Sequence, residues 1–209
     1  MREPQVLTAG LQEWATTCRA LGDGRVMLLV RKGGIHERGG GLFQPEQTRF
    51  ALMPTYLHQD QARIQEPFVA DYQASKVDPE PGMRRIELWA DVAAVWKATD
   101  LTTLQMLGPE LLWTPHELAT RFAYRDEPWL YVLALRVMRL PEPVAFPDQP
   151  AFAGCRSWLT LPAAIATEGS VPVLSAGYFE SRLDRISHVL SPGRTVSRTM
   201  SAPGRKPRS

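Results

Sequence analysis

The residues best suited to chemistry lie directly after Pro54, in the segment Thr-Tyr-Leu-His-Gln. Thr55, Tyr56, His58 and Gln59 place a hydroxyl, a phenol, an imidazole and an amide close together. An imidazole titrates near neutral pH and can act as a general acid or base. Because proline cannot donate to a strand ladder, we expect this segment to form a loop whose side chains are available for contact. Tyr56 and His58 are therefore candidate catalytic residues, and Thr55 and Gln59 are candidate binding residues.

Charged residues at the ends of two predicted strands form a second candidate group. Arg31 and Lys32 end an apolar run, Glu37 lies shortly beyond them, and Arg49 opens the next strand. A guanidinium can bind phosphate through two hydrogen bonds, and an ammonium paired with a carboxylate can form the edge of a ligand site. A charge at the end of a buried strand can equally be structural. Arg31, Lys32, Glu37 and Arg49 are kept as candidate binding residues under both interpretations.

The spacing of the lysines excludes a restriction-type nuclease core. Such a core needs an acid two residues before a lysine, because the carboxylates hold Mg²⁺ while the ammonium steadies the phosphate. The residues two positions before the four lysines are Val30, Ala74, Val95 and Gly204. If the chain works beside a nuclease, we expect it to do so as a partner.

Glycines and cysteines give no support for a cofactor or a metal. The glycines at 33–34 and 39–41 lack the spacing of phosphate-binding or dinucleotide-binding loops and are typical of a turn and a loop. Cys18 and Cys155 are too few for a disulfide scaffold and lack the spacing of a zinc site. The sequence predicts neither a cofactor nor a metal.

Length and charge predict one domain followed by a basic tail. A chain of 209 residues suits one domain with a sizeable core. Residues 191–209 contain five basic residues and no acid, and removing those five charges from the total of +2 leaves −3 for residues 1–190. We expect residues 1–6 and 192–209 to be disordered, with the tail either simply solvated or serving as a nucleic-acid-binding arm. No targeting or membrane segment is evident, so we expect a soluble cytoplasmic protein.

Local patterns predict helices at both ends of residues 7–191, with strands between them. Thr114-Pro115-His116-Glu117 is a capping box that should open a helix, and strict alternation from Ile86 to Val92 is typical of a strand. The predicted elements are a helix at 8–22, strands at 25–31 and 48–53, a helix at 61–73, a strand at 84–92, a helix at 114–124, strands at 129–140 and 157–161, and a helix at 175–190. The fold class expected is α+β, a single domain with a largely antiparallel mixed sheet flanked by N- and C-terminal helices.

Four packing expectations follow from these elements. The first two strands should pair as a hairpin, which would place Lys32 and Thr55 at opposite ends, about 20 Å apart. Four prolines after Leu140 should force an extended connection. Arg136 should pair with Glu87 or Asp91 if it is buried. The residues expected in the core are Leu28, Leu29, Phe50, Leu52, Leu88, Leu133 and Leu183.

Several segments of the chain resemble one prokaryotic family. They are Arg31-Lys32-Gly33-Gly34-Ile35, the run Phe-Ala-Leu-Met-Pro-Thr-Tyr-Leu-His-Gln at 50–59, Gly-Cys-Arg-Ser-Trp at 154–158, and Pro-Val-Leu-Ser at 172–175. The chain is similar over residues 9–190 to the domain-of-unknown-function family numbered eighteen-oh-two. The resemblance implies no established activity, although some members resemble components associated with restriction-type nuclease domains.

Three functional hypotheses remain open. The first is a nucleic-acid-associated binding or accessory module, linked to nucleic acid or to a nuclease-containing partner protein. It is motivated by the family, the basic tail and the aromatics expected to be exposed at Trp89, Trp96 and Trp113. The second is a small enzyme that acts on a nucleotide-like substrate with His58 as acid or base. The third is a protein-interaction domain without catalysis.

Overall fold

The computed structural model describes residues 6–32, 35–38, 42–45, 47–152 and 157–191. The side chains of residues 35–38 and 42–45 and of residue 151 lie outside this description, and so do Cys155, residues 1–5 and the tail at 192–209. The expected disorder of the two ends therefore remains a prediction.

A seven-stranded, mostly antiparallel sheet is the centre of the described fold, which confirms the predicted α+β class. Its main path runs β2-β7-β6-β5-β1-β8, and β9 pairs with β7. β1 and β5 are parallel, while the other pairs are antiparallel. The strands of this sheet are β1 (Val6–Trp14), β2 (Leu28–Arg31), β5 (Arg49–Thr55), β6 (Met83–Ala98), β7 (Leu130–Pro147), β8 (Trp158–Ala166) and β9 (Val171–Pro172).

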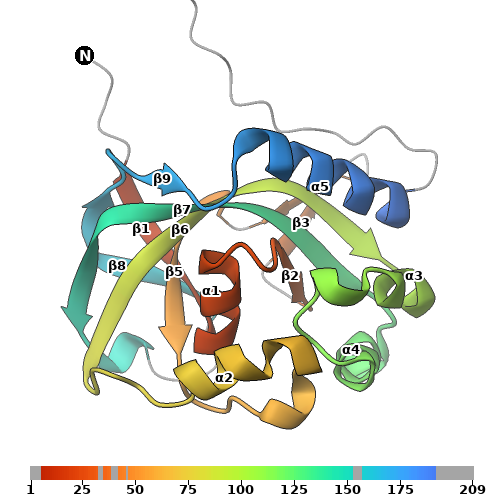
Figure 1. Cartoon of the computed structure of the whole chain (residues 1–209), viewed down its shortest axis with the longest axis horizontal. Coiled ribbons are helices and arrows are strands. Elements are labelled where there is room, and N and C mark those ends of the chain that lie inside the picture. The colour runs from red at the N-terminus through yellow and green to blue at the C-terminus, as the bar shows by residue number, and fades with distance from the viewer. Residues whose placement is uncertain (1–5, 33–34, 39–41, 46, 153–156, 192–209) are drawn as a thin grey trace, which may run out of the picture.

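Five α-helices pack around this sheet in the described part of the chain. In Figure 1, α1 lies in front of the sheet beside β5, α2 crosses below α1, α5 lies along the top, and α3 and α4 lie together at the right. Their bounds are α1 (Ala15–Gly22), α2 (Val69–Ser75), α3 (Leu101–Met106), α4 (Pro115–Phe122) and α5 (Ala176–Leu190). The short 3-10 helices are η1 (Gln61–Arg63), η2 (Glu66–Phe68), η3 (Gly108–Glu110), η4 (Tyr124–Asp126) and η5 (Pro150–Phe152).

Both faces of the central strands are buried. On β5, Phe50 and Leu52 point into a large core shared with α1 and α5, while Ala51 and Met53 point into a smaller core on the other face. All seven residues predicted for the core are buried, which confirms that expectation.

The predicted hairpin of the strands at 25–31 and 48–53 is wrong. β2 pairs with β7, whereas β5 pairs with β1 and β6. The segment between β2 and β5 forms its own two-stranded sheet, from β3 (Ile35–Arg38) and β4 (Leu42–Pro45). Although they are the two strands predicted to pair, β2 and β5 are therefore not neighbours in the sheet.

Three other predicted elements need correction. The helix expected at 61–73 is divided into the 3-10 helices η1 and η2 and the α-helix α2, which ends at Ser75. The first half of the helix expected at 8–22 is β1, and the helix begins only at Ala15. The prolines after Leu140 do not end β7, which continues to Pro147. Instead, they coincide with an irregularity of pairing, where the single residue 87 of β6 stands opposite residues 140–143 of β7. Because Pro141 and Pro143 have no N–H, this part of the ladder cannot be regular.

Candidate functional site

A cleft of about 430 Å³ opens between α1, the end of α2 and strands β6 and β7. Its size lies within the range of small-molecule sites, about 300 to 1,000 Å³. The residues that line it are Ala15, Cys18, Arg19, Gly22, Asp23, Leu52, Pro54, Tyr56, Ala74, Ser75, Val77, Pro79, Glu80, Arg85, Glu87, Leu88 and Arg139.

Apolar groups make up part of the cleft wall where α1 approaches the sheet. Leu52 and Leu88 are buried side chains of β5 and β6, and Ala15 and Gly22 are small residues of α1. A Cβ at Gly22 would lie only 2.8 Å from Cδ1 of Leu88, so a larger residue there would displace the end of the Leu88 side chain. This wall suits a flat apolar surface such as the face of a ring.

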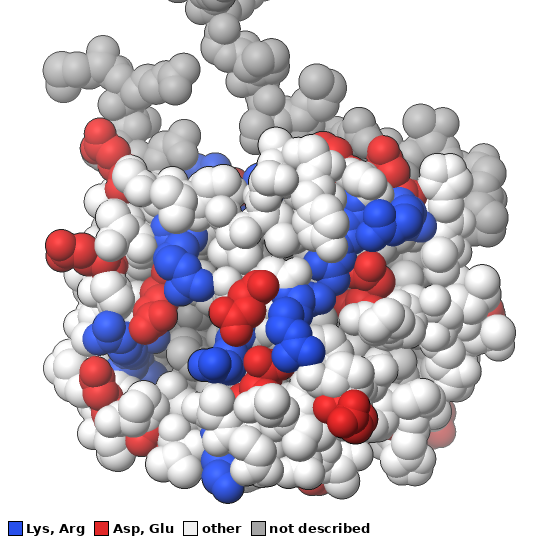
Figure 2. Space-filling model, in the orientation of Figure 1, with Lys and Arg blue, Asp and Glu red and all other residues white. Residues whose placement is uncertain are grey.

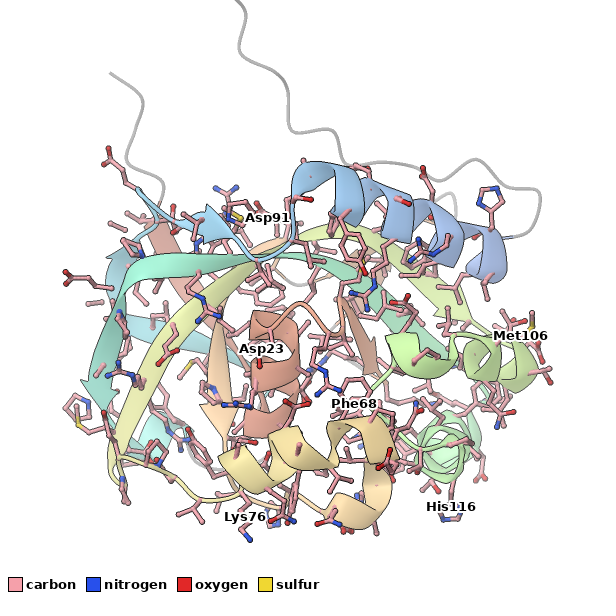
Figure 3. The ribbon with its side chains drawn as sticks, viewed as in Figure 1. Asp23, Phe68, Lys76, Asp91, Met106 and His116 are labelled. Atoms are coloured by element: carbon pink, nitrogen blue, oxygen red, sulfur yellow. The ribbon has the colours of Figure 1, made fainter. Side chains whose placement is uncertain are left out.

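Three arginines from three different elements stand around the cleft. Arg139 of β7 lies 3.7 Å from Glu87, and its Nη2 donates to the carbonyl of Gly22 at 2.8 Å. Arg85 of β6 bonds Glu87 at 2.9 Å, and Arg19 of α1 lies 4.0 Å from Asp23. Basic and acidic side chains accordingly alternate on this face rather than forming a patch of one sign (Figure 2). Asp23 follows α1 at the middle of the same view (Figure 3).

Among the side chains that the structure describes, Tyr56 is the one sequence-predicted site residue that lines the cleft. Burial raises the pKa of its phenol, and the nearby carboxylates of Asp78, Glu87 and Glu80 raise it further, as does Cys18. The phenol is therefore a neutral hydrogen-bond donor at physiological pH. Its hydroxyl has no hydrogen-bond partner within the described residues, and this leaves it available to a ligand.

Cys18 also faces the cleft, but it is a poor nucleophile. Burial raises the pKa of its thiol well above the ordinary value, and the charge of Glu13 raises it further. The reactive thiolate form is correspondingly suppressed near neutral pH.

Gln59 holds together the elements that surround the cleft. Its Oε1 accepts from the backbone N–H of Thr16 at 2.9 Å and from the hydroxyl of Thr16 at 2.7 Å. Its Nε2 donates to the carbonyl of Ser75 at 2.8 Å. One amide thus ties the start of α1 and the end of α2 to the loop after β5.

The remaining residues of the 55–59 segment stand apart from the cleft. His58 is exposed, has a left-handed φ of 62°, and is not among the lining residues. Thr55 is half-buried at the end of β5, in register with Trp14 of β1. The structure therefore separates the two candidate catalytic residues, placing Tyr56 in the cleft and His58 at the surface.

Arg31 is fixed by an ion pair whose two side chains are mostly buried, each being 12% exposed. Its Nη1 lies 3.0 Å from Oε2 of Glu13. Burial lowers the pKa of Arg31, Glu13 opposes that effect, and the charge of Arg121 adds to the lowering. Glu13 is in register with Pro54 near the end of β5. The separation of about 20 Å expected between the two motifs was derived from a hairpin of β2 and β5, and that hairpin does not form.

Lys32 and Arg49 also have partners within the fold. The ammonium of Lys32 donates to the carbonyls of Phe122, Glu127 and Trp129 and lies 4.4 Å from the ring centroid of Trp129. Arg49 forms two hydrogen bonds with Asp91, at 2.7 and 2.9 Å. The side chain of Glu37 lies outside the described residues.

The expectation that three tryptophans are exposed is wrong. Trp96 and Trp113 are buried in the large core, and Trp89 is buried in the smaller one.

The pairing of Arg136 with Glu87 or Asp91 was expected only if Arg136 is buried, and its side chain is 34% exposed. Arg136 bonds Glu180 of α5 at 2.6 Å, because α5 lies over β7 and brings that acid to it.

Sequence reasoning missed the arginines of the cleft. Arg85 and Glu87 did carry a signal, since they are two apart on a strand and therefore on one face. Arg19 and Arg139 carried none, because only the tertiary arrangement of α1 and β7 brings them to the same place.

A family model described as a domain of unknown function, DUF1802, matches residues 10–185. Two similar solved structures are ASCH from Zymomonas mobilis and a serine-to-alanine variant of the same protein. The first has 13% sequence identity, covers 85% of this chain and 93% of that chain, and gives a TM-score of 0.42. The second has 14% sequence identity, covers 76% of this chain and 90% of that chain, and gives a TM-score of 0.43. Scores of this size do not establish a shared fold. No curated protein matches the chain.

Proposed function

The chain belongs to the DUF1802 family, a domain of unknown function, and from this premise we propose that it is a nucleic-acid-associated binding module whose cleft accepts one unpaired nucleotide. The observation that carries the proposal is the combination, in one cleft, of an apolar wall, a phenol that can donate to a ligand and three arginines at the rim.

No helix in the described part of the chain is long and apolar enough to cross a membrane.

The size and wall of the cleft favour a single nucleotide. A volume of about 430 Å³ admits one base with its sugar and is too small for a duplex. Proteins read single strands by taking up unstacked bases against flat side chains and bonding their polar edges. The wall around Leu52 and Leu88 supplies apolar contact for the face of a base, and the phenol of Tyr56 supplies a donor for a base edge.

The rim arginines are suited to phosphate because they can exchange partners at little cost. Arg85, Arg139 and Glu87 are each between 42% and 46% exposed, so solvent screens their mutual ion pairs and leaves them weak. A guanidinium that turns from a carboxylate to a phosphate can form two parallel hydrogen bonds. The nearby acids would then accept from the donors of the base or sugar.

The enzymatic alternative has less support. It needs His58 as acid or base, and His58 is not among the residues that line the cleft. A nuclease-containing partner protein is compatible with the binding proposal, because no lysine of the chain has an acid two residues before it.

Binding to short single-stranded oligonucleotides tests the proposal. We expect the full chain to bind single strands more tightly than duplexes of the same length, because the cleft takes up an unpaired base. A chain ending at residue 190 should retain measurable binding with a shallower salt dependence. The five tail cations account for at most about −3.5 of the slope of log affinity against log salt on a single strand.

Fluorescence anisotropy measures the affinity of both chains for the same oligonucleotide over a matched series of salt concentrations. Loss of all binding on removing residues 191–209 would assign binding to the tail and refute a role for the cleft. Absence of binding by either chain at ~50 mM salt, where electrostatic contacts are strongest, would refute the nucleic-acid proposal.

A further inference from the structure

We propose that a second hollow, of about 310 Å³ beside α4, is a binding site for a small organic phosphate. The residues that carry the inference are Arg121, Arg63, Lys32, Glu117, Tyr124 and Leu130, all of which line it. The hollow shares no lining residue with the cleft, so the inference is independent of the proposed function.

Arg121 is held in place with part of its guanidinium unused. Its Cζ lies 3.6 Å from the centroid of the Trp113 ring, and its Nε donates to Glu117 at 2.7 Å. Trp113 is buried and is itself packed edge-on against Trp14. Within the described residues, the two terminal nitrogens of Arg121 have no acceptor. A stacked guanidinium with free terminal nitrogens is a pre-organised donor for an oxyanion.

The other charged side chains of the hollow have partners of their own and do not occupy the terminal nitrogens of Arg121. Glu117 is buried and is shared between Arg121 and Arg63, which lies 3.8 Å away. Lys32 contributes positive charge but no free donor, because its ammonium bonds three carbonyls. The flanking acids have partners as well, since Asp60 lies 3.3 Å from Arg63 and Glu127 acts on Lys32. What remains for a ligand is the pair of terminal nitrogens on Arg121.

A second guanidinium nearby makes an anion favourable at this place. Arg31 lies close enough for the charge of Arg121 to act on it. Arg31 does not line the hollow and acts on it through its charge alone. A bound anion would reduce the repulsion between these two cations.

The dimensions of the hollow call for an organic group besides the phosphate. About 310 Å³ is more than an inorganic phosphate fills. The apolar part of the wall comes from Leu130, which is buried, and from the ring of Tyr124, which is 54% exposed. His116 of α4 does not take part, since its side chain points away from the protein (Figure 3). The ligand class is therefore a phosphate monoester on a small, partly apolar group.

Isothermal titration of the full chain with inorganic phosphate and with phenyl phosphate tests the site. We expect both to bind, with phenyl phosphate the tighter. Arg121→Lys should weaken both by about tenfold or more, because it keeps the charge but removes the stacked, two-pronged donor. Arg125→Lys is the matched control. Arg125 is exposed and lies outside the lining, and its guanidinium lies 5.2 Å from the centroid of the Tyr124 ring, where lysine keeps a cation. This variant should bind as the unmodified chain does.

Tyr124→Ala provides a test that does not depend on the folding of the Arg121 variant. Because Tyr124 is exposed, its loss should leave thermal unfolding unchanged while abolishing the advantage of phenyl phosphate over inorganic phosphate. Undetectable binding of both probes at millimolar concentration would overturn the proposal. So would equal affinities in the Arg121→Lys and Arg125→Lys variants, or a Tyr124→Ala variant that keeps the full preference for phenyl phosphate.

Discussion

Replacing Arg182 with methionine is expected to lower the free energy of unfolding by about 3 to 5 kcal/mol, the usual cost of breaking a buried ion pair. Arg182 lies on α5 and is 5% exposed. Its Nε donates to Glu110 at 2.6 Å, and its terminal nitrogens donate to the carbonyls of Gly24 and Arg25 at 2.8 and 2.6 Å. Methionine fills similar space but leaves one carboxylate and two carbonyls without these donors.

Arg185 provides a matched control on the same helix. It reaches the same carboxylate at 4.0 Å, but its side chain is 60% exposed. Arg185→Met should therefore change the free energy of unfolding by no more than about 1 kcal/mol, as exposed ion pairs do. Urea unfolding followed by circular dichroism measures both variants. Equal losses would show that burial of the Arg182 network is not what stabilises the junction of α5 with the turn after α1.

Truncating Leu133 to alanine is expected to cost about 2 to 5 kcal/mol through lost burial and the cavity left behind. Leu133 lies near the start of β7, between Leu29 of β2 and Val95 of β6, and is fully buried. Leu57→Ala makes the same chemical change at a side chain that is 66% exposed, and it should alter stability by about 0.5 kcal/mol or less. A loss below about 0.5 kcal/mol for Leu133→Ala would place this strand at the surface.

Elements with strong local signals could be predicted from the sequence. Thr114 caps α4 by accepting from the N–H of Glu117, and Ser175 caps α5 by accepting from that of Tyr178. The alternation through Ile86 to Val92 correctly predicted β6. In each case the determinant is a side chain within a few residues of the backbone that it affects.

Strand pairing could not be predicted, because it depends on distant residues. Leu7, Ala9 and Leu11 alternate as in a strand, yet the apolar spacing that continues into α1 also fits one longer helix. Only the pairing of β1 with β5 and β8 decides in favour of a strand. The parallel pair β1 and β5 in turn keeps β2 away from β5, against the prediction of a simple hairpin.

The same limit applies to the cleft. Tyr56 was identifiable because it belongs to a short polar segment after a strand-ending proline. The arginines come from α1, β6 and β7 and meet only after the sheet and helix have packed. His58 and Gln59 share the segment with Tyr56, but one lies at the surface and the other holds α1 and α2 in place. The sequence therefore identified the segment that reaches the cleft. It did not show which of its residues lines the cleft, which lies at the surface and which holds the helices.

The most direct test of a nucleotide-binding cleft is to block it without unfolding the protein. Ala74 and Ala70 are both exposed on α2, and only Ala74 lines the cleft. Phenylalanine at either position carries a similar helix-propensity cost. The measurement is the affinity of each variant for a short single-stranded oligonucleotide at ~200 mM salt, where the contribution of the tail is reduced. We predict that Ala74→Phe weakens binding by about tenfold or more, or about 1.4 kcal/mol, while Ala70→Phe binds as the unmodified chain does. Unchanged affinity in a folded Ala74→Phe variant would contradict the proposal that the cleft takes up the nucleotide.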